Sequence, residues 1–205
     1  MRIYYADIRG LDESRALYPG TSKSRGSAFG VSLLAAAYAD CAGRAMLPKI
    51  ERQLLGRPVF SSEPELNFSV SHSDTHVVCA LSHSPVGIDT EPADRAVSRR
   101  VIEKLTTAEE REFLSFLEIW TLRESLFKLT GEGDLRTMRF YRRLGKIVAP
   151  VEGAKCRIYK DVEGAVISVS TFDGSFPNKL IEIPAKQLLK KDKPLQSYPK
   201  GFRLD

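Results

Sequence analysis

The sequence lacks the long apolar runs and cysteine patterns that membrane-spanning and disulfide-bonded proteins need. Its longest apolar stretch, Val31 to Ala39, is interrupted by a serine and a tyrosine, and a membrane-spanning helix needs roughly 20 apolar residues. Three cysteines, Cys41, Cys79 and Cys156, are widely spaced and form no CxxC pair. This spacing supports neither a disulfide framework nor a structural zinc site, so we expect buried free thiols.

The first residues also lack the features of a secretory signal. Met1 to Asp7 contains an early acid and no apolar h-region, and reads as a first strand. We therefore expect a cytoplasmic protein with no membrane partner.

What is present is typical of a soluble globular protein. The chain has 205 residues, of which 42% are hydrophobic and 28% charged, enough for one or two domains. Its formal net charge is +5, which favours an anionic partner. Nucleic acid, a phosphorylated cofactor and an acidic protein all remain possible on charge alone.

The first part of the chain indicates helix followed by strands. Residues 21–57 are predicted to be mainly helical, because apolar residues recur at helical spacing up to Pro48. These apolar residues are Phe29, Leu33, Leu34, Ala37 and Cys41. Residues 76–81 and 86–91 then predict a β-hairpin joined by a polar turn.

The second part repeats this order. A polar stretch at 92–100 is the predicted boundary between an N-terminal half, residues 1–100, and a C-terminal half, residues 101–205. Thr106 and Glu109 suggest a capping box. A helix is expected at 119–130, ending at Gly131, with antiparallel strands at 156–160 and 165–171. The predicted fold class is α+β with two similar halves, although their strands share little beyond β character.

Asp89 and Glu91 form a candidate metal site. They lie two residues apart on a predicted strand and so project from the same face. Two neighbouring carboxylates raise each other's pKa unless a cation lies between them, and oxygen ligands suit magnesium. An exposed strand face with lysine or arginine partners would show the same pattern.

Glu124 and Lys128 are four residues apart on the predicted helix and share one of its faces. This order also suits an ordinary surface ion pair worth about 0.3 to 0.5 kcal/mol. However, Trp120, Glu124 and Lys128 border the apolar stripe of the helix, so we expect the two charged groups to be only partly exposed. Glu124 could complete a three-carboxylate site, and Lys128 could meet a phosphate.

Ser71 and His72 end a predicted strand and open a turn. Hydroxyls and backbone amides can converge on an anion in such a turn. It could also be only a turn, with His72 as a structural histidine.

Three segments together, 68–73, 86–91 and 120–128, resemble in order and spacing the three motifs of the Sfp-type phosphopantetheinyl transferases. Leu55 to Pro58 looks like the short Gly-x-Pro segment before the first motif. The resemblance implies a monomer of two similar α+β halves, a pseudo-dimer, with coenzyme A in the cleft between them.

By motif position, the resemblance implies a role for each candidate residue. Asp89, Glu91 and Glu124 would hold Mg²⁺, and Lys128 would contact the phosphates. Ser71 and His72 would bind near the 3'-phosphate, and the Gly56, Arg57 and Pro58 segment near the adenine. Further phosphate contacts would come from Lys23, Arg25 and Ser27.

The reaction implied is transfer of 4'-phosphopantetheine from coenzyme A to a serine of an apo acyl or peptidyl carrier protein, releasing 3',5'-ADP. Glu124 is the candidate base, and residues 93–117 the candidate carrier-binding region. Two features depart from the family pattern: Arg123 replaces the usual lysine, and the segment 131–135 has an extra residue.

Two alternatives remain from the sequence. The first is a basic nucleic-acid-binding protein, suggested by a cluster of arginines around two aromatic residues. The cluster consists of Arg136, Arg139, Arg142 and Arg143 around Phe140 and Tyr141. The second is a protein of the same fold that binds coenzyme A without turnover.

Overall fold

A computed structural model describes residues 1–20, 26–52 and 57–190. Its first elements are β1 (Arg2–Asp7), η1 (Glu13–Arg15), α1 (Ser27–Ala42), β2 (Ile50–Arg52), β3 (Pro58–Phe60), β4 (Asn67–His72), β5 (His76–Ser82) and β6 (Val86–Pro92). The remaining elements are α2 (Arg99–Leu105), α3 (Ala108–Arg111), α4 (Phe116–Thr130), β7 (Tyr141–Arg143), β8 (Lys146–Val148), β9 (Lys155–Tyr159), β10 (Ala165–Thr171), β11 (Ile181–Glu182) and η2 (Ala185–Leu188).

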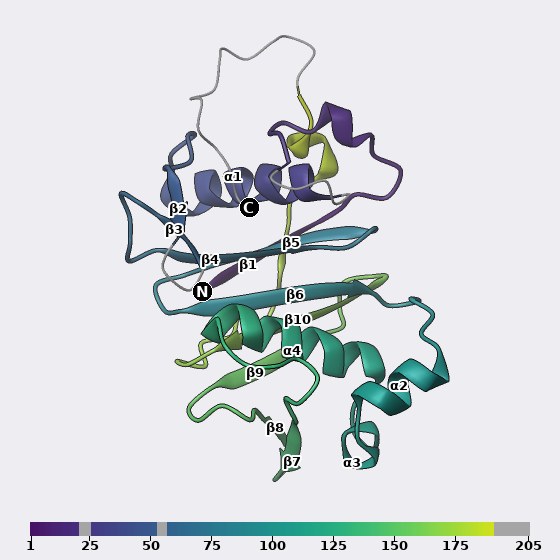
Figure 1. Cartoon of the computed structure of the whole chain (residues 1–205). Helices are drawn as coiled ribbons and strands as arrows, with labels where there is room; N and C mark the ends of the chain where they lie inside the picture. Colours follow the sequence, from purple (N-terminus) through teal and green to yellow (C-terminus); the bar gives the residue numbers. More distant parts are fainter. Residues whose placement is uncertain (21–25, 53–56, 191–205) are drawn as a thin grey trace.

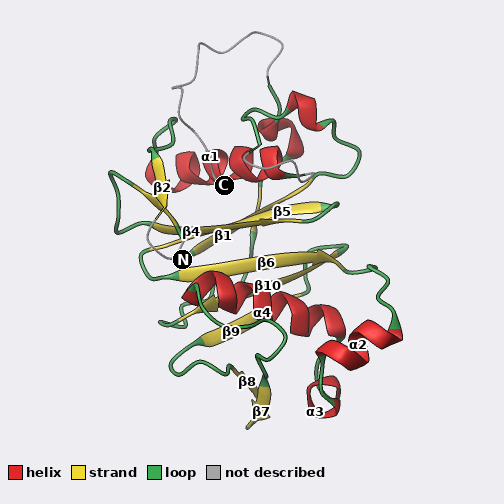
Figure 2. Cartoon of the chain, in the orientation of Figure 1, coloured by secondary structure: helices red, strands yellow, loops and turns green. Residues whose placement is uncertain are grey.

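The chain forms four layers: α1, a first sheet, a second sheet and α4 (Figures 1 and 2). Within the described residues, the first sheet has the strand order β11-β1-β5-β4 and the second β6-β10-β9. Two short hairpins, β2-β3 and β7-β8, accompany them. The mixed α+β class predicted from the sequence is confirmed.

Strand β5 shows why the first sheet lies in the middle of the molecule. Every residue of β5 is buried. Val77, Cys79 and Leu81 share a core with α1, while Val78 and Ala80 share another core with β6 and β10. Because successive side chains point to opposite faces, a nearly continuous apolar strand fits between two apolar layers.

Strand β6 has one apolar and one polar face. Val86 and Ile88 pack in the core between the sheets, so Gly87, Asp89 and Glu91 alternate to the face covered by α4. A Cβ atom on Gly87 would lie 1.9 Å from the carbonyl oxygen of Ser125. The absence of a side chain at Gly87 therefore lets α4 approach the strand that carries the two acids.

The predicted hairpin of residues 76–81 and 86–91 is wrong. Strand β5 is hydrogen-bonded to β1 on one side and β4 on the other, and β6 pairs with β10. Both edges of β5 are thus occupied, and the chain crosses to the second sheet after Ser82. The hairpin partner of β5 is instead β4.

The first long helix is shorter than predicted. Four of its expected core residues, Phe29, Leu33, Leu34 and Ala37, are buried as expected. The helix ends at Ala42 because Gly43 adopts a left-handed conformation with φ of 66°, and residues 50–52 form β2 instead of continuing it. Cys79 is buried, but Cys41 and Cys156 are only partly buried; all three are free thiols.

The C-terminal elements agree more closely with the sequence. Helix α4 ends at Thr130 before a left-handed Gly131, and β9 and β10 pair antiparallel. The capping box lies one residue later than predicted, at Thr107 and Glu110. A second one, at Ser115 and Glu118, begins α4.

The proposed division at residue 100 stays a prediction. Strand β6, which precedes it, pairs with β10, which follows it. In return, β11 joins the first sheet beside β1. Among the described residues, no helix combines the length and hydrophobicity needed to cross a bilayer.

Replacing Gly87 by alanine should weaken the packing of α4. The new methyl group would overlap the backbone of Ser125 and Leu129, so the helix must move, at a cost of about 3 kcal/mol in the free energy of unfolding. Gly43→Ala is the control, because its Cβ would meet nothing within 4 Å and only its left-handed backbone costs about 1 kcal/mol. Urea unfolding compares the two; an equal or smaller loss for Gly87→Ala would contradict the close approach.

Candidate active site

Three side chains from separate elements meet where the two sheets adjoin. Ser71 on β4 donates a hydrogen bond to Asp89 Oδ1 on β6, at 2.6 Å. Lys128 on α4 donates to the same Asp89 oxygen at 2.7 Å and to Ser71 Oγ at 2.9 Å. Ser71 and Asp89 are buried, whereas the Lys128 side chain keeps 29% of its surface exposed.

Small polar residues hold α4 against its sheet. Thr121 hydrogen-bonds to Ser168 at 2.7 Å and Ser125 to Ser170 at 2.8 Å, all four side chains being buried. Lys128 Nζ also donates to the carbonyl oxygen of Ile88 at 3.2 Å. These bonds fix the helix both along and around its axis, and so fix where Glu124 and Lys128 point.

Glu91 and Glu124 complete the group of acids. Burial raises the pKa of Glu91, although its ion pair with Arg95 opposes the rise. Burial also raises the pKa of Glu124, and the charge of Asp89 adds to the rise. No hydrogen bond or ion pair joins the Glu124 carboxylate to another described residue. The three carboxylates therefore repel one another in a partly buried setting.

The acids suit a hard divalent cation chemically, although they do not surround one here. Among the residues that the structure describes, no group of three or more His, Cys, Asp or Glu side chains is arranged to hold a metal ion. Lys128 and Arg95 neutralise Asp89 and Glu91 instead. Glu124, which has a raised pKa and no hydrogen-bond donor among the described residues, would gain from a cation. Binding would require at least Lys128 to turn away from Asp89.

The sequence left open two purely structural interpretations: an exposed strand face carrying Asp89 and Glu91, and a surface ion pair between Glu124 and Lys128. Each is wrong in part. Asp89 is buried and is not on an exposed strand face. Lys128 pairs with Asp89 across the interface, and no ion pair with Glu124 is formed within the described part of the chain. The i,i+4 spacing therefore places Glu124 and Lys128 on the same face of α4, toward Asp89, without an ion pair between them.

His72 lies between this group and the start of α1. Burial lowers its pKa, and the charge of Lys128 lowers it further. A Cβ on Gly26 would lie 3.3 Å from the His72 ring, so the first turn of α1, which begins with the buried Ser27, adjoins the histidine. Lys23 and Arg25 lie outside the described residues.

Arg57, in the middle of the Gly-x-Pro segment, lies at the other end of β4. Arg57 donates to Asn67 Oδ1 at 3.2 Å, and burial lowers the pKa of Arg57. Asn67 begins β4, four residues before Ser71, which is about 13 Å along a strand. Pro58 begins β3, and Gly56 lies outside the described residues. An elongated ligand would be needed to contact both ends.

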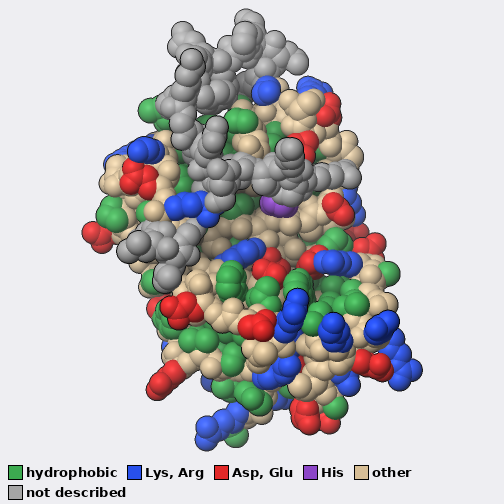
Figure 3. Space-filling model, in the orientation of Figure 1, with side chains coloured by type: hydrophobic (Ala, Val, Ile, Leu, Met, Phe, Trp, Pro, Cys, Tyr) green, Lys and Arg blue, Asp and Glu red, His purple; other side chains and the backbone are tan. Residues whose placement is uncertain are grey.

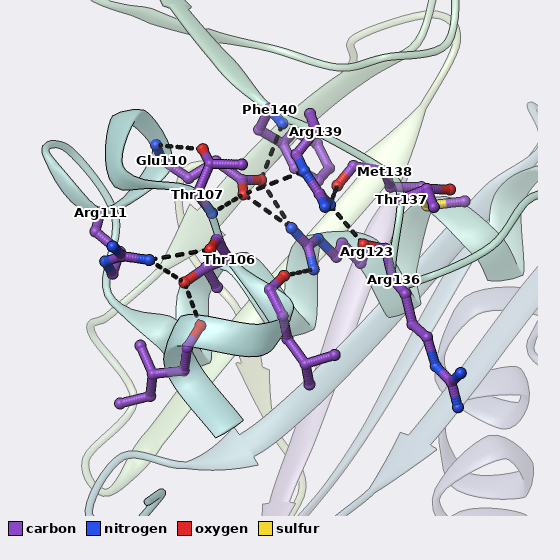
Figure 4. A network of polar contacts seen from close by, with 12 residues as sticks. Thr106, Thr107, Glu110, Arg111, Arg123, Arg136, Thr137, Met138, Arg139 and Phe140 are labelled. Atoms are coloured by element: carbon purple, nitrogen blue, oxygen red, sulfur yellow. Dashed lines mark hydrogen bonds and ion pairs between the residues drawn. The ribbon is translucent and has the colours of Figure 1, made fainter. Parts of the chain in front are cut away.

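Sequence reasoning missed the role of Arg123. This side chain is fully buried and forms a two-pronged ion pair with Glu110 on α3 (Figure 4). It therefore acts within the protein and away from Asp89. The capping-box pattern at Thr107 to Glu110 could have indicated a fixed glutamate, but not its partner.

The arginines of the rival nucleic-acid interpretation do not all form a binding face with the aromatic residues. Phe140 is buried. Arg139 donates to the carbonyl oxygens of Arg136 and Met138 and lies 4.0 Å from Glu110 (Figure 4). Tyr141 is exposed on β7 beside the exposed Arg142 and Arg143, so one of the two aromatic residues remains available at the surface of this segment.

On the face shown in Figure 3, acidic and basic side chains lie next to one another across the middle of the molecule, between the upper and lower layers. This mixture matches the paired acids and cations described above. It also leaves charged groups of both signs accessible to a ligand.

Comparison with known proteins finds one family model and several relatives that resemble this chain. The family model of the 4'-phosphopantetheinyl transferase superfamily matches residues 85–161, which include Asp89, Glu91, Glu124 and Lys128. Over 158 residues the chain is 27% identical to 4'-phosphopantetheinyl transferase Sfp of Bacillus subtilis, covering 69% of the chain and 70% of the relative.

Two further relatives match over shorter stretches. The chain is 37% identical over 87 residues to 4'-phosphopantetheinyl transferase psf-1 of Bacillus pumilus, covering 38% of the chain and 37% of the relative. It is 35% identical over 79 residues to 4'-phosphopantetheinyl transferase gsp of Aneurinibacillus migulanus, covering 34% and 33%. These matched stretches span little more than a third of the relatives' length. Together with the family model, they show that the chain is similar to 4'-phosphopantetheinyl transferases over these stretches.

Proposed function

We propose that the chain transfers 4'-phosphopantetheine from coenzyme A to a serine of an apo acyl or peptidyl carrier protein and releases 3',5'-ADP. The observation that carries this proposal is the meeting of Ser71, Asp89 and Lys128, with Glu91 and Glu124 beside them. These residues come from three separate segments, each of which resembles a motif of the family. The names of the relatives support the same reaction.

Coenzyme A would lie in a cleft between two similar halves of a cytoplasmic monomer. Ser71, His72 and Ser27, with Lys23 and Arg25, would bind near its 3'-phosphate. The Gly56, Arg57 and Pro58 segment would bind near the adenine. The separation of these two groups along β4 fits a ligand as long as coenzyme A.

Asp89, Glu91 and Glu124 would hold Mg²⁺, which when bound would neutralise charge on the pyrophosphate oxygens. Lys128, once released from Asp89, would donate hydrogen bonds to the same phosphates. Glu124 would accept the proton of the carrier serine. The serine oxygen then forms a bond to the β-phosphorus, and the bond to the 3',5'-ADP oxygen breaks with its electron pair on ADP.

The carrier would bind around residues 93–117. This region includes α2, which has no buried residue and exposes Arg99, Arg100 and Lys104. Arg99 pairs with Glu103 on the same helix, so Arg100 and Lys104 are the cations of α2 that would meet an acidic partner, because complementary charge speeds association.

Transfer is tested directly by incubating the protein with coenzyme A, magnesium and an apo carrier, and weighing the carrier by mass spectrometry. We expect the carrier to gain one phosphopantetheine group, and chelation of magnesium to stop the gain. Coenzyme A binding without any mass gain, across several types of carrier, would favour the non-catalytic alternative. Salt-sensitive DNA binding without coenzyme A affinity would favour the nucleic-acid alternative.

Asp89→Asn tests the site. The amide can still accept from Ser71 and Lys128, so the fold should be kept, but a negatively charged metal ligand is lost. We expect transfer to fall by at least about 100-fold. Asp173→Asn is the matched control, because Asp173 accepts from the backbone of Ser175 in an exposed loop. Full activity of Asp89→Asn would remove the metal assignment.

A further inference from the structure

The buried ion pair of Glu110 and Arg123 joins several separate segments of the chain. Arg123 Nη2 lies 3.0 and 2.9 Å from the two carboxylate oxygens of Glu110, and both side chains are at most 1% exposed. Glu110 also accepts from the backbone of Thr107 at 3.1 Å and Phe140 at 3.2 Å. Arg123 Nη1 donates to the carbonyl oxygen of Leu105, the last residue of α2 (Figure 4).

Stability alone gives a weak reason for this pair. Removing two charges from water costs free energy, and apolar residues of similar volume often replace a buried ion pair without loss. In addition, Arg123 Nε is buried without a hydrogen-bond partner in the described structure. Unlike apolar residues, the ion pair makes directional hydrogen bonds. Each of these bonds fixes the position of one backbone group.

Helices α2 and α3, which receive these bonds, have few buried side chains to fix their position. Helix α2 has seven residues and none is buried, and α3 has four residues of which only Glu110 is buried. Helices this short are not stable alone. Besides Arg123, Arg111 Nη1 supports the corner between them by donating to the carbonyl oxygen of Thr106 at 3.0 Å.

These two helices are connected to the segments that carry the carboxylates. Helix α2 follows β6 after a short loop, in which Arg95 pairs with Glu91. Arg123 immediately precedes Glu124 on α4, yet its side chain is buried against α3. The pair therefore adjoins Glu124 in sequence, while its hydrogen bonds are with α2, α3 and Phe140.

We propose that Glu110 and Arg123 are a positioning pair for the acceptor protein: they hold α2 and α3 so that Arg100 and Lys104 of α2 meet an acidic carrier. Neither residue contacts coenzyme A or the serine. The inference rests on the proposed function, since it assigns a part of the protein to binding the acceptor and not the donor.

The double variant Glu110→Leu/Arg123→Met separates positioning from stability. It removes the two charges but also leaves the backbone groups of Thr107, Phe140 and Leu105 without their partners, so the thermal midpoint should fall, and the comparison of KM with kcat and coenzyme A affinity isolates the positioning role. We expect KM for the apo carrier to increase about tenfold, because charged docking contacts are displaced, while kcat and the affinity for coenzyme A change by less than about twofold. Amide hydrogen exchange over residues 99–112 should become faster.

Two further variants complete the test. Lys160→Met is the matched control, because it removes another ion pair of α4, that with Glu118, and it should leave KM for the carrier unchanged. Arg123→Lys keeps the charge but loses the fork, and should raise KM by less than the double variant. If the double variant does not fold, Arg123→Lys carries the test alone.

Unchanged KM and unchanged hydrogen exchange would overturn the proposal. An equal loss of coenzyme A affinity would also overturn it, because the pair would then support the whole site. If the unaltered protein transfers nothing to any carrier, the proposed function fails. The hydrogen exchange of residues 99–112 still shows in that case whether the pair holds α2 and α3, and unchanged exchange rejects this role.

Discussion

The site depends on one interaction: the bond of Lys128 and Ser71 to the same oxygen of Asp89. Ser71 belongs to the first sheet, Asp89 to the second, and Lys128 to the helix outside the second. A buried carboxylate needs partners, since leaving it unpaired costs several kcal/mol. The contact therefore joins three layers. It also places the carboxylate of Asp89, the ammonium group of Lys128 and the hydroxyl of Ser71 within hydrogen-bond distance of one another.

This contact requires α4 to lie unusually close to β6. Gly87 offers no side chain, and the serine and threonine pairs between α4 and β10 are small enough to keep the distance short. A helix packed through larger apolar residues would hold Glu124 and Lys128 farther from Asp89. On its other side, α4 carries Arg123, whose ion pair fixes α3 and the end of α2. The same helix thus organises both the acids and the surface beside them.

The sequence predicted the elements near the site better than their pairing. The two-residue spacing of Asp89 and Glu91 identified their common face on β6, and Gly131 identified the end of α4. The hairpin prediction failed because adjacent strands can enter different sheets, and nothing local in β5 shows that both its edges are occupied. The Lys128 to Asp89 bond and the Glu110 to Arg123 pair join residues 39 and 13 positions apart, so only the folded chain brings them together.

The central claim is that metal, pyrophosphate and Asp89 meet at one place. Phosphorus NMR of bound coenzyme A, with Mn²⁺ in place of magnesium, tests it most directly, since a paramagnetic ion broadens the nearest phosphorus signals most. The account predicts strong broadening of the two pyrophosphate signals, weaker broadening of the 3'-phosphate, and loss of the effect in Asp89→Asn with coenzyme A still bound. Equal broadening in the variant, or none in the unaltered protein at saturating ligand, would contradict it.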